Sequence, residues 1–111
     1  MIEQRDLLLV PFPFSDQTGT KVRPVVVMSN DNFNNNSEDL LVIGVTSHIS
    51  KGKYNLILTN NFLEQGKLNN PCIIKVENIL KIDNSLVIKK IGRIKEELFE
   101  KIVQTLIEII K

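Results

Sequence analysis

Uninterrupted apolar runs in the first half of the chain predict short, buried β-strands. They cover residues 7–10 (LLLV), 25–28 (VVVM) and 40–45 (LLVIGV). A β-branched and apolar run without polar alternation is typical of a strand buried on both faces, and residues 25–28 fit this description best. Pro11 and Pro13 follow the first run. Because proline is excluded from the interior of a central strand, we expect that strand to stop there.

Alternation in the second half of the chain predicts one long strand with an exposed face. Every second position is mainly apolar, namely Cys72, Ile74, Val76, Asn78, Leu80 and Ile82, while Lys75, Glu77 and Lys81 occupy positions between them. A period of two places the first set on one face of the strand and the second set on the other. Shorter strands are expected at residues 55–59 and 86–91.

The last segment, residues 95–111, has the period of an amphipathic helix. A broad apolar stripe is formed by Leu98, Ile102, Leu106 and Ile110 at intervals of four, flanked by Phe99, Val103 and Ile109. Glu96 and Glu97 suit the positive N-terminal end of the helix dipole. No Ser, Thr, Asp or Asn precedes the helix as a cap, so we expect its first turn to fray.

Polar, turn-forming segments separate these elements. Residues 15–20 (SDQTGT), 30–36 (NDNFNNN) and 60–70 (NNFLEQGKLNN) are interpreted as loops. Side chains that bond to their own backbone favour turns over helix or strand. Five to seven short strands and one C-terminal helix then predict a mainly β fold, a small and strongly curved antiparallel sheet covered by that helix.

Length and composition bound the possible functions. A chain of 111 residues with 42% hydrophobic residues predicts a single globular domain over residues 1–111. No apolar run approaches the ~18 residues of a membrane span, and the first residues, MIEQRD, lack a secretory signal pattern, so we expect a cytoplasmic protein. One cysteine and one histidine exclude an intrachain disulfide and argue against an all-protein zinc site; no metal or cofactor is expected.

The charge of the chain is balanced overall but unevenly distributed. A net charge of +1 argues against a protein that coats nucleic acid by bulk electrostatics. Residues 1–50 hold three basic and six acidic side chains, whereas residues 51–111 hold eleven and seven. Lys21 and Arg23 are therefore conspicuous in the first half. Any anion site requires the fold to bring them beside bases from the second half.

Arg23 is the first candidate for chemistry. Pro24 follows it directly, fixes its own φ, lacks an N–H and biases Arg23 toward an extended conformation at the start of the predicted strand at residues 25–28. A planar, permanently charged guanidinium held in this way suits bidentate contact with phosphate or carboxylate. The residues alone are equally consistent with an arginine that closes a structural salt bridge.

A second polar group follows the strand predicted at residues 40–45. Thr46, Ser47 and His48 supply two hydroxyls and an imidazole that could meet a phosphate, although spacing alone is consistent with a strand cap. Cys72 falls on a mainly apolar face, which favours a small buried residue over a nucleophile. Lys75 and Glu77 could form a functional pair, but an exposed strand ladder ordinarily looks the same.

Several of these segments, in this order and spacing, resemble the MazF/PemK family of toxin endoribonucleases. The most specific are RPVVVMSND (residues 23–31) and the strand that ends in Val45-Thr46-Ser47. Further similarity lies in LLLVPFPF (7–14) with the loop after it, in IIKVENILKI (73–82) with the following Asp83, and in IGRIKEEL (91–98). The resemblance covers nearly the whole chain. Two departures are Cys72, near which the family usually has serine, and the missing helix cap, where the family often has serine.

The resemblance implies a fold, an activity and partners. It implies the SH3-like barrel shared by MazF and the gyrase poison CcdB, a homodimer, and a toxin restrained by a cognate antitoxin with an acidic tail. It also implies metal-independent, sequence-specific cleavage of single-stranded RNA, in which the ribose 2′-OH attacks its own phosphate. The products are a 2′,3′-cyclic phosphate and a 5′-OH, and the consequence for the cell is inhibited translation and growth.

The resemblance also implies roles for particular residues. Arg23 and Thr46 match the family's catalytic arginine and threonine. No residue is identified as the general base: His48 is chemically able but is not part of the recognised motif, and Glu77 lies on a different strand. RNA contacts are expected from Lys21, Thr20, Ser47, His48 and Phe14. The ring of Phe14, like that of Phe12, could stack on bases, although plugging the barrel or the dimer contact is the alternative. The competing functions are a toxin that binds a protein such as gyrase, with an idle Arg23, and a silent SH3-like interaction module.

Overall fold

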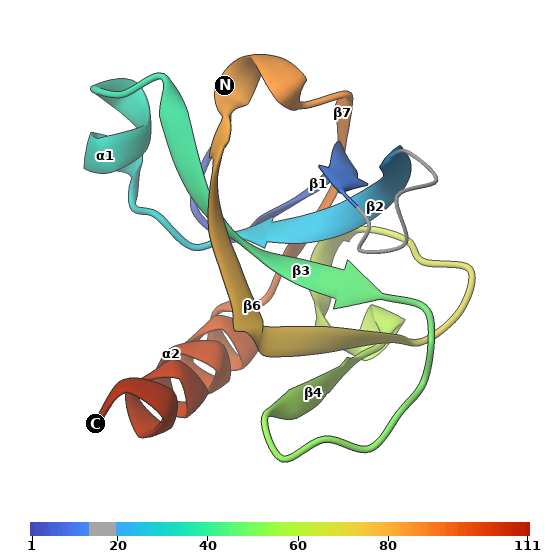
Figure 1. Cartoon of the computed structure of the whole chain (residues 1–111). Coiled ribbons are helices and arrows are strands. Elements are labelled where there is room, and N and C mark those ends of the chain that lie inside the picture. The colour runs from blue at the N-terminus through green and yellow to red at the C-terminus, as the bar shows by residue number, and fades with distance from the viewer. Residues whose placement is uncertain (14–19) are drawn as a thin grey trace.

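The computed structural model describes residues 1–13 and 20–111, with residues 12, 13 and 20 described by their backbone alone (Figure 1). The described residues form seven strands: β1 (Asp6–Pro13), β2 (Thr20–Val27), β3 (Asp39–Thr46), β4 (Asn55–Leu58), β5 (Leu63–Gly66), β6 (Cys72–Asp83) and β7 (Lys89–Ile94). They make one sheet in the order β4-β6-β3-β2-β1-β7-β5, and each paired neighbour is antiparallel. The sheet curls into a half-barrel, and the long helix α2 (Glu96–Ile110) lies against it. The mainly β fold with a C-terminal helix is confirmed.

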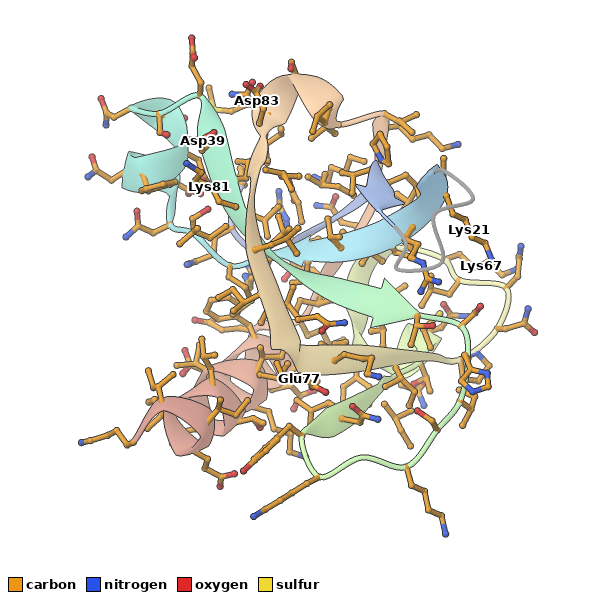
Figure 2. The ribbon with its side chains drawn as sticks, in the orientation of Figure 1. Lys21, Asp39, Lys67, Glu77, Lys81 and Asp83 are labelled. Carbon is orange, nitrogen blue, oxygen red and sulfur yellow. The ribbon has the colours of Figure 1, made fainter. Side chains whose placement is uncertain are left out.

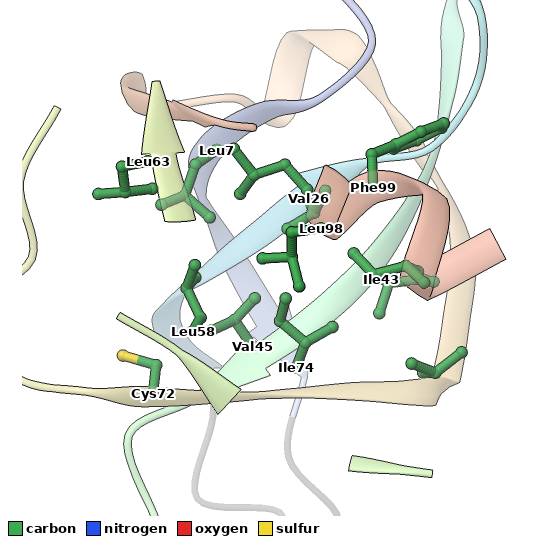
Figure 3. Packing of buried hydrophobic residues seen from close by; sticks show 13 residues of the cluster. Leu7, Val26, Ile43, Val45, Leu58, Leu63, Cys72, Ile74, Leu98 and Phe99 are labelled. Carbon is green, nitrogen blue, oxygen red and sulfur yellow. The ribbon is translucent and has the colours of Figure 1, made fainter. Parts of the chain in front are cut away.

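The valines of β2 hold the centre of the sheet. Val25, Val26 and Val27 are fully buried, and they divide between two hydrophobic clusters. Val26 packs in the cluster under α2, where it joins Leu98 and other core residues (Figure 3). Val25 and Val27 pack in a second cluster on the opposite face of the strand. The prediction that this strand is buried on both faces is therefore confirmed.

Pro11 and Pro24 lie inside strands and not at their ends, so the two predictions about them were wrong. Pro11 pairs with Val22 and continues β1, while Pro24 pairs with Leu9 in the middle of β2. Both positions are tolerated because a neighbouring strand is missing on one side. β7 covers β1 only from Asp6 to Leu9, and β3 covers β2 only from Val25 to Val27. A proline whose backbone nitrogen faces away from the paired strand removes no hydrogen bond from the sheet.

A sharp bend in β6 overturns the prediction that its even-numbered side chains share one face. The strand turns a corner beside α2 (Figure 1). β3 and β6 pair up to Ile43 opposite Ile79, and pairing resumes at Val45 opposite Ile74, so β6 carries extra residues opposite Gly44. Those residues exchange the two faces. Cys72, Ile74 and Val76 pack in the cluster under α2, whereas Leu80 and Ile82 pack in the cluster on the other face.

Two segments interpreted as loops contain regular structure. Within residues 30–36 a short helix, α1 (Asp31–Asn35), forms because the Asn30 side chain accepts from the Phe33 N–H at 2.8 Å, a regular N-cap. Within residues 60–70 the chain forms a 3₁₀ turn, η1 (Asn60–Phe62), followed by β5. Gly66, at a φ of 88°, lies so close to β7 that a side chain would collide with the Ile91 carbonyl. The asparagine and glycine residues that predicted turns thus also form regular elements, since Asn30 caps α1 and Gly66 allows β5 to approach β7.

Helix α2 confirms the predicted amphipathic stripe over most of its length. Leu98, Phe99 and Ile102 are buried against the sheet, while Ile110, at the end of the stripe, is 71% exposed. The N-cap position is Lys95, whose side chain makes no capping hydrogen bond, as expected from the sequence. A second 3₁₀ turn, η2 (Asn84–Leu86), begins after Asp83, which accepts from the Ser85 N–H at 2.8 Å.

Candidate RNA-binding and catalytic site

A hollow of about 330 Å³ opens where β3 ends, between β2 and the bend of β6. Its described lining consists of Arg23, Gly44, Val45, Thr46, His48, Ser50, Lys75 and Asn78. These residues come from β2, from β3 and the loop after it, and from β6. The fold therefore brings together basic side chains from the two halves of the chain, Arg23 and Lys75, as the charge distribution required of an anion site.

Arg23 and Thr46, predicted from separate parts of the sequence, are in direct contact. The register of β2 and β3 ends at Val25 opposite Gly44, and two further residues along each strand place Arg23 opposite Thr46. The Arg23 guanidinium, from Nη1, donates to Thr46 Oγ1 at 3.4 Å. Arg23 is half-buried, so its guanidinium is held by the fold while one side remains open to the hollow.

The Thr46 hydroxyl is held in a defined orientation. Its Oγ1 accepts from the Arg23 guanidinium and also from the backbone N–H of His48 at 3.1 Å. A hydroxyl has two acceptor lone pairs and one O–H donor. Since both lone pairs are used, the O–H remains to donate to a group in the hollow. An anionic oxygen is a suitable acceptor there.

Lys75 and Asn78 belong to the lining although the sequence did not select them as site residues. Lys75 was considered only as a partner of Glu77, and Asn78 was placed on an apolar face. The bend of β6 opposite Gly44 brings both to the hollow. Gly44 was the available signal, because an isolated glycine in an apolar strand often marks a bulge or a close backbone approach.

The chemistry of the lining suits a phosphate. The described lining contains a guanidinium, an ammonium, an imidazole, two hydroxyls and an amide, and it includes no Asp or Glu. Hydrogen bonds from charged donors to anionic oxygens are about twice as strong as neutral ones. Such a lining is chemically suited to an anion.

Other predicted site residues lie apart from the hollow or outside the description. Ser47 is exposed and is not in the described lining, and Lys21 is exposed near the start of β2 (Figure 2). Thr20 begins β2, but its side chain lies outside the described residues, as does the whole of Phe14. Glu77 lies at the corner of β6 beside α2, so the structure does not bring it to the hollow with Lys75 (Figure 2).

Cys72 is a core residue. It is 6% exposed within the cluster under α2, and burial raises the pKa of its thiol. Its Sγ donates to the Asn70 carbonyl at 3.5 Å. A buried thiol of raised pKa is a poor nucleophile, in agreement with the packing interpretation.

Across residues 1–13 and 20–111, no group of three His, Cys, Asp or Glu side chains is placed to hold a metal ion. In the same ranges, no helix has the length and apolar character needed to cross a membrane.

Known toxins resemble the chain in sequence and in fold. Residues 3–110 match the sequence model described as "PemK-like, MazF-like toxin of type II toxin-antitoxin system". A MazE–MazF structure from Deinococcus radiodurans superposes with a TM-score of 0.79 at 15% identity, over 98% of this chain and 95% of that chain. An endoribonuclease in complex with its cognate antitoxin, from a mycobacterial species, superposes with a TM-score of 0.76 at 11% identity, over 99% of this chain and 95% of that chain. The Mycobacterium tuberculosis toxin MazF-mt6 superposes with a TM-score of 0.74 at 15% identity, over 92% of each chain.

Proposed function

Because the chain belongs to the PemK-like, MazF-like toxin family of type II toxin–antitoxin systems, we propose that it is an active endoribonuclease whose reaction takes place in the hollow between β2, β3 and β6. Toxins of this family are generally endoribonucleases. The observation that carries the proposal is the hydrogen bond between Arg23 and Thr46 inside an anion-binding hollow. Single-stranded mRNA in the cytoplasm is the substrate.

The reaction is a transesterification within the RNA. The ribose 2′-OH attacks the adjacent phosphorus, a 2′,3′-cyclic phosphate forms, and the 5′-oxygen of the next nucleotide leaves. The nucleophile belongs to the substrate, so the protein needs no activated serine or cysteine. It needs donors placed where negative charge grows on the phosphoryl oxygens.

Arg23 and Thr46 have complementary roles in this step. Arg23 donates to the phosphoryl oxygens and stabilises the pentavalent transition state, a contribution that typically changes the rate by roughly 10² to 10³. Thr46 Oγ1, already fixed by two donors, gives its O–H to the phosphate and so orients it. The Lys75 ammonium, which also lines the hollow, adds positive charge to it.

The test of this function is an incubation of the purified protein with RNA in EDTA, followed by analysis of the new ends. We expect cleavage in EDTA that leaves 2′,3′-cyclic phosphate and 5′-OH ends. Intact RNA, or cleavage that stops when EDTA is added, would contradict the proposal. Lys21 and the basic second half of the chain are expected to hold the flanking nucleotides, so binding should weaken as salt rises.

We further propose that the chain acts as a homodimer, with an RNA groove formed partly across the interface. Support comes from the family and from large apolar side chains that stay exposed in the single chain, including Ile88 at 53% and Ile110 at 71%. Sedimentation at micromolar concentration should therefore show a species of twice the 12.6 kDa chain mass. A purely monomeric species would contradict this proposal.

A cognate antitoxin with an acidic, partly disordered tail is the proposed protein partner. Two solved relatives, the MazE–MazF structure and the mycobacterial endoribonuclease, were determined as complexes with antitoxins. An acidic tail can mimic RNA and compete for Lys21 and Arg23. Binding should weaken as salt rises and should be lost to excess RNA. A partner gene product that neither binds nor suppresses toxicity would remove this proposal.

A further inference from the structure

The proposed reaction requires an acceptor for the proton of the 2′-OH. The described lining of the hollow is rich in donors and poor in bases. Guanidinium and ammonium groups carry N–H donors and no acceptor lone pair. Arg23 and Lys75 therefore stabilise negative charge on the phosphate but cannot take the proton while they remain charged.

Among the other polar residues of the described lining, one is suited to accept the 2′-OH proton. Both lone pairs of Thr46 Oγ1 already accept hydrogen bonds, and the Ser50 hydroxyl and the Asn78 amide are not bases in the neutral pH range. The described lining contains no carboxylate. His48 is the one described lining residue whose side chain, an imidazole, offers a ring nitrogen that commonly acts as a general base.

The backbone fixes where His48 stands relative to the other site residues. Its N–H donates to Thr46 Oγ1 at 3.1 Å, which closes a tight turn directly after β3. The same Oγ1 accepts from Arg23 Nη1 at 3.4 Å. One hydroxyl thus links the turn that carries the imidazole to the guanidinium. His48 is exposed, so its side chain can meet a bound ribose and can be replaced without opening the core.

We propose that His48 is the general base of the reaction, an inference that rests on the proposed endoribonuclease function. The neutral imidazole accepts the 2′-OH proton as the O2′–P bond forms. The P–O5′ bond breaks, and O5′ leaves with its electron pair and takes a proton from solvent water. The imidazolium then returns its proton to solvent, so no other reactant is required. General base catalysis of this kind contributes roughly 10² to 10⁴ in rate.

The experiment is chemical rescue of the full-length His48→Ala protein. The probe is a long synthetic RNA that contains every pentanucleotide, cleaved under single-turnover conditions, with the fold of each variant checked by circular dichroism and thermal unfolding. We expect His48→Ala to bind RNA normally and to cut it about 10²-fold more slowly or worse. Added imidazole should raise that rate in proportion to the concentration of neutral imidazole.

Matched variants separate a base from a structural or binding residue. His48→Gln keeps a polar side chain of similar size, and it should be as slow as His48→Ala and rescued less by imidazole. Arg23→Ala should be slow and not rescued by imidazole at all. Ile49→Ala changes the adjacent residue, which is 60% exposed and is not in the described lining, and it should cut at the wild-type rate.

The outcomes distinguish this inference from the proposed function. A wild-type protein that cuts no RNA would overturn both. A cutting wild type together with an equally fast His48→Ala, or with a slow His48→Ala that imidazole does not rescue, would overturn the role of His48 alone. A slow, folded His48→Ala protein that regains its rate in imidazole would establish it.

Discussion

Two charged regions of the molecule differ in what surrounds their positive groups. The first, which we name the Asp6 cluster, consists of Glu3, Arg5, Asp6, Glu64, Lys90 and Arg93. The second is the hollow lined by Arg23, Thr46, His48 and Lys75. In the Asp6 cluster each cation lies against a carboxylate. In the hollow the described lining offers cations and hydroxyls and no carboxylate.

The Asp6 cluster is closed to solvent at its centre. Asp6 is fully buried, and its oxygens accept from Arg93 Nε at 3.0 Å and from the Glu3 N–H at 2.8 Å, with Lys90 Nζ at 3.1 Å. The hydrogen bond to Asp6, with the nearby charges of Asp6 and Glu3, raises the pKa of Arg93. These contacts join the N-terminal residues to β7. Their role is to hold the fold together.

The hollow differs from the Asp6 cluster, because Arg23 and Thr46 are held in place while they line a surface that a ligand can reach. Arg23 is fixed by its place in β2 and by Thr46, and Thr46 is fixed by His48. Preorganised donors of this kind stabilise charge that develops during a reaction. A cluster of positive side chains is therefore not enough to indicate a binding site in this chain. The absence of carboxylates from its described lining is what distinguishes the hollow.

The largest expected effect is on the rate in the hollow. Arg23→Ala should lower single-turnover RNA cleavage by about 10² to 10³, because a preorganised donor to the phosphate is lost. The free energy of unfolding should change by no more than about 1 kcal/mol, as for exposed ion pairs. Arg23→Lys should recover part of the rate, since a point charge lacks the bidentate fork. Near-normal cleavage by folded Arg23→Ala would contradict the mechanism.

Next in size is a loss of stability from the Asp6 cluster. Asp6→Asn removes the buried carboxylate that pairs with the partly buried Arg93 and the exposed Lys90, and it should lower the free energy of unfolding by about 3 kcal/mol. Cleavage per folded molecule should not change. The matched control is Asp39→Asn, which breaks the partly exposed pair with Lys81 at 3.7 Å (Figure 2) and should cost about 1 kcal/mol or less. Urea unfolding measures both, and equal losses would contradict the distinction.

Thr46 is expected to contribute less than Arg23. Thr46→Ala removes one hydroxyl donor and should slow cleavage roughly tenfold, since a hydrogen bond to a charged group is worth about 1.5 kcal/mol. Thr46→Ser keeps the hydroxyl and should stay closest to the wild-type rate. A Thr46→Ser protein as slow as Thr46→Ala would show that the methyl group, and not the hydroxyl, matters.

The smallest expected effect is at Asp83, outside both regions. The hydrogen bond from the Ser85 backbone N–H holds the pKa of Asp83 below its ordinary value of 3.8. A carboxyl whose pKa is lower in the folded than in the unfolded protein stabilises the fold at pH values above its unfolded-state pKa. That stabilisation disappears as the pH falls through its folded-state pKa. Urea midpoints should therefore show Asp83→Ala slightly less stable than wild type at pH 7 and equal to it at strongly acidic pH. A gap that stays constant with pH would contradict this account.

Local sequence patterns were sufficient to predict the parts of the fold that depend on continuous burial. The apolar run at Val25–Val27 and the helical stripe from Leu98 onward are where the sequence placed them, because burial itself imposes these patterns. β5 was missed because Leu63 is its one buried residue. The helix α1 was missed because asparagine serves equally well in a turn and as a cap.

The site was predictable only in part. Arg23 and Thr46 were candidates from the sequence, and the family resemblance supplied their catalytic roles. The register of β2 and β3 explains why they meet. Lys75 and Asn78 reach the hollow through extra residues in β6 opposite Gly44, a long-range irregularity that a period of two cannot show. Phe14 lies outside the described residues and remains a prediction, as does the Thr20 side chain.

A double-mutant cycle between Arg23 and Thr46 tests most directly the central claim that these residues act together on one phosphate. Single-turnover cleavage would be measured for wild type, Arg23→Ala, Thr46→Ala and the double variant, each shown to be folded. Residues that act as a unit are strongly non-additive, so the double variant should be scarcely slower than Arg23→Ala alone. A double variant whose loss equals the product of the two single losses would contradict the account, because it would make the 3.4 Å contact between Arg23 and Thr46 irrelevant to the reaction.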